Sequence, residues 1–103
     1  MTAPTASLTS PAVLVVGVVG ELDLSSVARV REEIEDALAA RPEQLVVDLS
    51  GCPFVDASAL AMLLEAHRRA CRAGGVLTLR GCSPRVLRLL SLTGLSRVFD
   101  VAN

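Results

Sequence analysis

The sequence of 103 residues contains no lysine, tryptophan or tyrosine and only two phenylalanines. The lack of lysine excludes chemistry that depends on a side-chain amine, such as a Schiff base. The near absence of aromatic rings excludes a stacking platform for single-stranded nucleic acid and predicts an aliphatic core. Ten arginines almost balance eleven acidic residues, so no strong field favours direct binding of DNA or of an anionic membrane.

Long apolar runs are also missing, since the stretch from Ala12 to Val19 is far shorter than the roughly 20 residues that cross a bilayer. The N-terminus lacks the basic start of a secretion signal. Three cysteines and one histidine form no zinc pattern, and an odd number of cysteines argues against a disulfide framework. We therefore expect a cytoplasmic protein without membrane insertion, metal or cofactor.

Hydrophobic patterning divides the chain into alternating strands and helices. Residues 1–10 are expected to form a flexible tail or a short edge strand, and residues 11–103 a single domain. Strands are predicted over 13–19, 44–49, 76–80 and 97–101, and helices over about 25–40, 57–73 and 84–92. The first two strands are expected to be buried on both faces. The alternation predicts an α/β fold: a mostly parallel sheet of four or five strands with three or four flanking helices.

The first predicted helix is amphipathic and is expected to start with a polar cap. Asp23 or Ser25 is predicted to provide that cap. Four apolar residues are predicted to face the core, namely Val27, Val30, Ile34 and Leu38. Two pairs of opposite charge at i,i+4 are predicted on the outer surface, namely Arg29 with Glu33 and Arg31 with Glu35.

The stretch from Val46 to Leu64 reads as a buried strand, a tight loop and a second amphipathic helix. Asp56 and Ser58 stand at the opening turn of that helix, where backbone N–H groups are unpaired. A helical wheel places a core stripe on one side, made of Leu60, Leu63, Leu64, His67, Ala70 and Cys71. The opposite side carries Ser58, an exposed Met62, Glu65 and Arg69. Ser58 is therefore expected to face away from the core.

Two interpretations of Ser58 remain open at this point, since serine and aspartate are both common helix caps. A catalytic serine is disfavoured, because His67 lies on the opposite side of the same helix and no second histidine exists. A phosphate-accepting Asp48 of the response-receiver type is excluded by the lack of lysine. Cys52 and Cys82 are expected in loops, where they could be oxidised.

The functional interpretation is a module that is switched by phosphorylation of Ser58. A phosphate adds about −1.5 to −2 charges and three acceptor oxygens. The dipole at a helix N-terminus tolerates such charge, so the fold is expected to survive the modification. A partner docked over this turn would instead meet new charge beside Asp56.

Three motifs, in order and spacing, resemble those of STAS domains and in particular single-domain bacterial anti-sigma factor antagonists. They are residues 20–23 (GELD), residues 46–50 (VVDLS) leading to residues 54–60 (FVDASAL), and residues 73–75 (AGG) followed by a strand, a Ser-Pro helix start and residues 93–95 (TGL). Each motif is weak alone, but three in register are specific. The resemblance covers nearly the whole chain from about residue 12.

The resemblance implies a regulator of transcription with no enzymatic activity of its own. Its unphosphorylated form would bind an anti-sigma factor, itself a serine kinase, and so release a sigma factor. Phosphorylation of Ser58 by that kinase would end the binding, and a phosphatase would restore it. The partner surface implied by the matched motif and the wheel consists of Asp23, Asp56, Ser58, Ala59, Met62 and Glu65.

The chain departs from the family pattern immediately after Ser58, where the family usually has glycine. Ala59 is expected to place a methyl group beside the acceptor hydroxyl and so to affect access by the kinase. The chain also ends where the family often adds a helix, which would leave surface exposed for self-association. The alternative function is a STAS adaptor that binds an ABC-type lipid transporter constitutively and does not need the serine.

Overall fold

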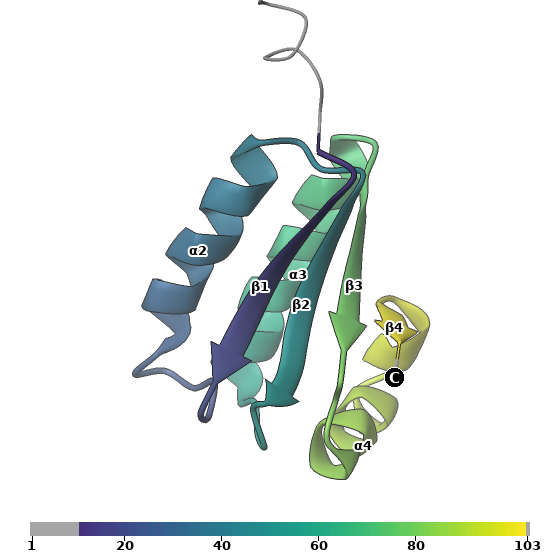
Figure 1. The fold of residues 1–103 in the computed structure, drawn as a ribbon. Coiled ribbons are helices and arrows are strands. Elements are labelled where there is room, and N and C mark those ends of the chain that lie inside the picture. The colour runs from purple at the N-terminus through teal and green to yellow at the C-terminus, as the bar shows by residue number, and fades with distance from the viewer. Residues whose placement is uncertain (1–10, 103) are drawn as a thin grey trace, which may run out of the picture.

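Strands and helices alternate along the chain in the order that the sequence predicts (Figure 1). The structure is a computed structural model and describes residues 11–102. Its elements are β1 (Val13–Val19), α2 (Val27–Ala39), β2 (Gln44–Gly51), α3 (Ala57–Arg72), β3 (Val76–Arg80), α4 (Pro84–Leu92), the 3₁₀ helix η1 (Leu95–Arg97) and β4 (Asp100–Ala102). The expected tail or edge strand at residues 1–10 lies outside the described residues.

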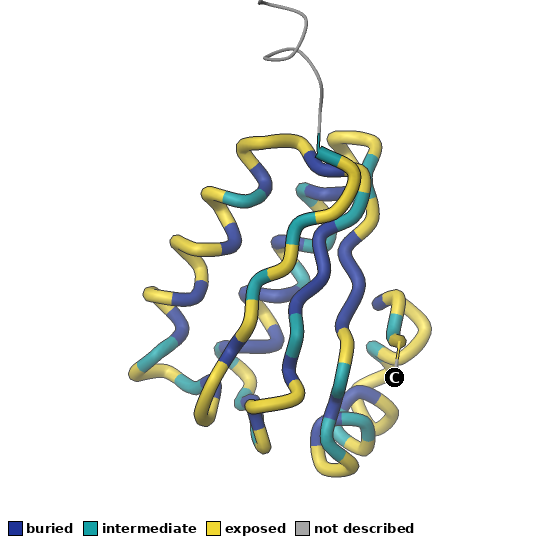
Figure 2. Tube along the Cα trace, viewed as in Figure 1, coloured by how far each residue is buried: buried dark blue, intermediate teal, exposed yellow. Residues whose placement is uncertain are grey.

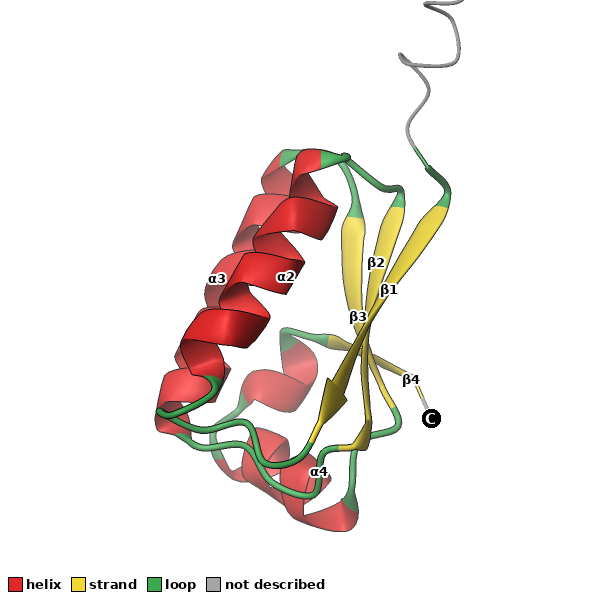
Figure 3. Cartoon of the chain, turned by 60° about the vertical axis from the view of Figure 1, so that its left-hand side comes forward, coloured by secondary structure: helices red, strands yellow, loops and turns green. Residues whose placement is uncertain are grey.

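The four strands form one parallel sheet in the order β1-β2-β3-β4. Successive right-handed crossovers that advance in one direction place their helices on the same side of a sheet. Accordingly, α2 and α3 lie side by side on one face (Figure 3). The predicted α/β fold with a parallel sheet is confirmed.

The burial of β1 differs from the prediction, because this strand is not buried on both faces. The side chains of Val13 and Val15 are 50% and 52% exposed, while the alternate residues Leu14 and Val16 pack against the core. Strand β2 lies between β1 and β3 and is mostly buried, as predicted. Among residues 11–102, helices α2 and α3 cover one face of the sheet (Figure 3), and β1 is an edge strand, so its alternate side chains on the other face are exposed.

The start of α2 also differs from the prediction. The helix begins at Val27 with Ser26 as its N-cap, and the Ser26 side chain makes no capping hydrogen bond. The prediction that Asp23 or Ser25 caps this helix is therefore wrong. The Asp23 carboxylate instead accepts the backbone N–H of Ser25 at 3.0 Å and shapes the loop before the helix.

The last strand starts later than the sequence predicts. Gly94 adopts a positive φ of 76° just after α4, a conformation that favours glycine. The chain then forms η1, which ends at Arg97, the residue at which the strand was expected to begin, and β4 begins at Asp100. Phe99, just before β4, is buried in the core.

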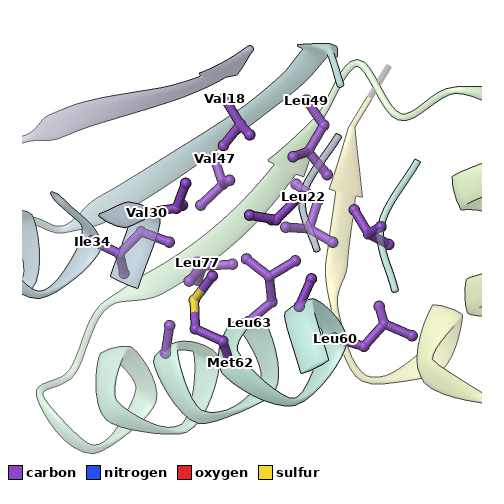
Figure 4. Packing of buried hydrophobic residues seen from close by; sticks show 14 of the residues in the cluster. Val18, Leu22, Val30, Ile34, Val47, Leu49, Leu60, Met62, Leu63 and Leu77 are labelled. Carbon is purple, nitrogen blue, oxygen red and sulfur yellow. The ribbon is translucent and has the colours of Figure 1, made fainter. Parts of the chain in front are cut away.

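One aliphatic core fills the space between the sheet and the helices (Figures 2 and 4). Helix α2 contributes the four residues that its pattern predicts, Val27, Val30, Ile34 and Leu38. Neither predicted i,i+4 pair is formed among the described ion pairs; Glu35 instead pairs with Arg69 of α3 at 3.3 Å. Within residues 11–102, every helix is too short or too polar to span a bilayer.

Candidate functional site

The opening turn of α3 follows the carboxyl end of β2 and meets the loop that leaves β1 (Figure 1). Leu22 donates its backbone N–H to the carbonyl of Phe54 at 3.0 Å, and Asp56 donates its N–H to the carbonyl of Leu22 at 3.1 Å. Leu22 also forms a parallel bridge with Val55, and both side chains are fully buried. The β1–α2 loop is therefore fixed against the start of α3.

Asp56 caps α3 and joins three parts of this site. Its Oδ1 accepts the backbone N–H of Ala59 at 2.9 Å and the hydroxyl of Ser58 at 2.6 Å. Its Oδ2 accepts the backbone N–H of Leu24 at 3.0 Å. These bonds, above all the one from Ser58, hold the pKa of Asp56 below its usual range, so the side chain is a carboxylate at neutral pH.

The hydroxyl of Ser58 is not the helix cap, which answers the question that the sequence leaves open. The capping bond comes from Asp56, and the described bond of the Ser58 hydroxyl is its donation to that carboxylate. The side chain is half-buried and lines a hollow of about 200 Å³ between α2 and α3. The site therefore presents an oriented hydroxyl at the surface that the helix cap does not use.

Met62 forms part of the floor of this hollow, and the prediction of an exposed Met62 is wrong. Its side chain is only 5% exposed and lies in the core with Ile34 of α2 (Figure 4). Helix α3 packs against α2 as well as against the sheet. Its buried surface is therefore wider than the single core stripe that the helical wheel assigns to it. Glu65 and Arg69 also line the hollow, and Glu65 is exposed as predicted.

Ala59 is fully buried, with no exposed side-chain surface, and belongs to the core. Its methyl group is therefore inside the protein, and the expectation of a methyl group beside the acceptor hydroxyl is wrong. The backbone N–H of Ala59 is taken by Asp56. The side chain of Ala59 thus belongs to the core and contributes nothing to the surface around Ser58.

Asp23 lies in the loop that packs against the start of α3. Its Oδ1 accepts the backbone N–H of Ser25 at 3.0 Å and the Ser25 hydroxyl at 2.6 Å. The bond from the Ser25 side chain is the main reason that the pKa of Asp23 is lowered. Two carboxylates, those of Asp23 and Asp56, therefore hold this end of the molecule in shape.

Comparison with known proteins decides the relationship of the chain to others. The family model described as STAS domain matches residues 6–103. The chain belongs to the STAS domain family. A curated relative, the anti-sigma F factor antagonist of Paenibacillus polymyxa, is 31% identical over 90 residues, which cover 86% of this chain and 77% of the relative.

Solved structures share the fold of this STAS chain. A crystal structure of an anti-sigma factor antagonist from Mycobacterium paratuberculosis matches with a TM-score of 0.80 and 28% identity, over 88% of this chain and 77% of the other. SpoIIAA of Bacillus in its phosphorylated form matches with a TM-score of 0.68 and 23% identity, over 93% of this chain and 86% of the other. The second likeness shows the fold alone. The predicted family is confirmed.

The remaining reactive side chains of the STAS chain lie apart from Ser58. The ring of His67 stacks edge-on against Phe99 with centroids 5.6 Å apart, and its Nε2 lies 3.7 Å from the sulfur of Cys71. Cys71 is exposed, so its predicted place in the core is wrong. Cys52 and Cys82 lie in loops, as predicted, but both are buried, and burial raises the pKa of both thiols, which makes them less prone to oxidation. Residues 11–102 bring together no metal-binding group of three or more histidine, cysteine or acidic side chains.

Leu24 is the part of the site that the sequence does not reveal. Its backbone N–H reaches a carboxylate 32 residues further along the chain. A backbone donor is present at every residue except proline, so residue types carry no signal for such a contact. Only the packing of the two loops brings Leu24 and Asp56 together.

Proposed function

We propose that this STAS chain is an anti-sigma factor antagonist, which binds an anti-sigma factor in its unmodified form and so frees a sigma factor. The observation that carries the proposal is the surface hydroxyl of Ser58, held by Asp56 at 2.6 Å and not used as a helix cap. The relatives from Paenibacillus polymyxa and Mycobacterium paratuberculosis, both named as anti-sigma factor antagonists, support it.

Ser58 is the residue that the anti-sigma factor, acting as a serine kinase, modifies in this proposal. The Oγ of Ser58 attacks the γ-phosphorus of ATP, the Oγ–P bond forms, and the bond between that phosphorus and ADP breaks. Asp56 orients the hydroxyl, but its lowered pKa makes it a weak base. The hydroxyl proton therefore passes to a base of the kinase. A phosphatase reverses the change by hydrolysis, which releases inorganic phosphate.

The charge of the phosphate acts on the partner more than on the fold. At the start of α3 the helix dipole favours a negative charge by about 0.3–1 kcal/mol. The half-buried position of Ser58 leaves room for the group on the solvent side. A partner that covers this turn meets the added charge next to the carboxylate of Asp56. The unmodified chain therefore binds, and the phosphorylated chain releases its partner.

The partner surface in this proposal combines polar groups of the hollow with those of the neighbouring loop. Ser58 and Glu65 line the hollow, and the half-buried Asp23 and Asp56 lie in the loop beside it and at the start of α3, respectively. Met62 supports it from below and, with Ala59, contributes packing in place of a direct side-chain contact. The chain acts in the cytoplasm as a single domain over residues 11–103, without catalysis of its own. Self-association stays a prediction.

The proposal is tested with candidate anti-sigma factor kinases from the same organism. Each is incubated with the chain and ATP, and the modified residue is identified by mass spectrometry. Phosphate is expected on Ser58, none is expected on Ser58→Ala, and Ser58→Thr serves as the control that keeps a hydroxyl. A kinase that binds the chain and leaves Ser58 unmodified would overturn the switch. Equal partner affinities of Ser58→Ala and Ser58→Asp would favour the constitutive transporter adaptor.

A further inference from the structure

Leu24 extends a leucine side chain into solvent from the loop between β1 and α2. The side chain is 77% exposed, although burial of a leucine side chain is favourable. A single exposed apolar residue is ordinary on a protein surface, so exposure alone assigns no role. What distinguishes Leu24 is how its backbone is held and to what it is bonded.

Hydrogen bonds fix the loop on both sides of Leu24. Asp23 donates its backbone N–H to the Oγ of Ser26 at 3.1 Å, and Ser26 donates this hydroxyl to the carbonyl of Glu21 at 3.0 Å. Ser25 donates its N–H to the Oδ1 of Asp23 at 3.0 Å. A residue that is already held in place loses little backbone entropy when a partner covers it, which favours binding.

The same carboxylate holds Leu24 and the hydroxyl of Ser58. The Oδ2 of Asp56 accepts the N–H of Leu24 at 3.0 Å, and its Oδ1 accepts the Ser58 hydroxyl at 2.6 Å. Both residues therefore contact one side chain, although Leu24 lies in the β1–α2 loop and Ser58 in the first turn of α3. A partner that contacts Ser58 lies within reach of the exposed leucine.

We propose that Leu24 is an apolar anchor of the surface that binds the anti-sigma factor, and that Asp56 sets its position together with that of Ser58. The inference rests on the proposed function and specifies the partner surface that fits: an aliphatic pocket beside polar groups for the Ser58 hydroxyl. Leu24 fills the pocket, while Asp56 keeps both contacts in register.

Phosphorylation would act on both contacts through Asp56. The phosphorylated Oγ has no hydrogen to donate, so the bond to Oδ1 is lost, and the phosphate repels the carboxylate. A displaced carboxylate no longer accepts the N–H of Leu24. The modification thus disturbs the apolar anchor as well as the hydroxyl. Release of the partner is therefore more complete than the release that the added charge at Ser58 would cause alone.

The anchor is tested by the affinity for the anti-sigma factor that phosphorylates Ser58, measured by calorimetry. Leu92 of α4 is a matched control, because its side chain is also 77% exposed. Leu24→Ala should weaken binding by at least about tenfold, since a buried leucine contact is lost. Leu92→Ala should change it less than about twofold. Leu24→Met, which keeps an apolar side chain of similar size, should retain most of the affinity.

The outcomes separate this inference from the proposed function. If the wild type binds and Leu24→Ala binds with the same affinity, the anchor is overturned and the proposed function stands. The same holds if Leu92→Ala loses as much affinity as Leu24→Ala. A wild-type chain that binds none of the anti-sigma factors of its organism overturns both.

The link through Asp56 is tested without any partner, by the amide resonances of the chain in solution. Ser58→Asp and Asp56→Asn should both shift the amide signal of Leu24, because each changes the carboxylate that this N–H contacts. The amide signal of Leu92 should stay in place in both variants. A Leu24 amide that does not respond to Ser58→Asp overturns the link.

Discussion

The Oγ of Ser58 lies 2.6 Å from the Oδ1 of Asp56, and the same oxygen caps α3 through the N–H of Ala59. The cap and the modifiable hydroxyl are thus adjacent but belong to different side chains. Loss of the Ser58 hydroxyl alone, as in Ser58→Ala, therefore leaves the capping oxygen in place. The cap of α3 is provided by Asp56, whereas the hydroxyl that can be modified belongs to Ser58.

Replacing Ala59 by glycine, the residue usual in the family, should lower the free energy of unfolding by about 1 kcal/mol or more. The variant loses a buried methyl group and gains backbone freedom in the unfolded state. Its rate of phosphorylation should equal that of the wild type, because the methyl group faces the core. Denaturant unfolding and a kinase assay measure the two effects.

Ala57→Gly is the control for this experiment, since Ala57 is exposed at the first position of the same helix. It should cost less stability than Ala59→Gly. Phosphorylation that becomes much faster in Ala59→Gly alone would mean that the methyl group does obstruct the kinase, against the burial described above.

Met62→Ala should destabilise the chain by about 2–5 kcal/mol, the range for truncation of a buried large apolar side chain. Glu65→Ala, three residues further along α3, should stay within about 0.5 kcal/mol of the wild type. The ion pairs of Glu65 with Arg68 and Arg72 are exposed and contribute little. Urea unfolding distinguishes the two variants, and equal losses would contradict the position of Met62 in the floor of the hollow.

The order of elements follows from the sequence because its signals are local. Gly74 ends α3 with a positive φ of 85°, and Ser83 caps α4 by accepting the N–H of Val86 at 3.2 Å, with Pro84 in the first turn. Turn residues and caps act within a few positions of themselves. Hydrophobic periodicity likewise needs no knowledge of neighbouring elements to identify a helix or a strand.

The wrong predictions concern what each element packs against. A wheel assigns one buried stripe to a helix, but α3 contacts both the sheet and α2, which buries Met62 and leaves Cys71 exposed. The apolar run of β1 is equally consistent with one covered face or with two. Asp56 and Ser58 are recognisable together because they are close in the chain, whereas the bond between Asp56 and Leu24 depends on tertiary packing.

Acid should destabilise the chain through carboxylates whose pKa is lower in the folded state than in the unfolded state. Bonds from the backbone and side chain of Ser50, and then from Arg80, lower the pKa of Asp48 to about 2, and the pKa values of Asp23 and Asp56 are lowered too. On acidification the unfolded state binds these protons first. Stability should therefore fall as the pH drops from roughly 4, the usual aspartate value, towards 2.

Urea unfolding at a series of pH values measures this dependence. Asp48→Asn should flatten the curve in the acidic range, because it removes one of the groups that takes up a proton on unfolding. Asp36→Asn, on an exposed position of α2, is the matched control. An Asp48→Asn curve as steep as that of the wild type would show that the bonds from Ser50 and Arg80 do not stabilise the folded state.

The most direct test of the account compares two forms of one chain that differ only at Ser58. Phosphoserine is introduced at this position during synthesis, and the affinity of each form for the cognate anti-sigma factor is measured by calorimetry. Circular dichroism checks that both forms are folded. The phosphorylated form should bind about a hundredfold or more weakly, because the partner meets a like charge beside Asp56. Equal affinities of two folded forms would contradict it.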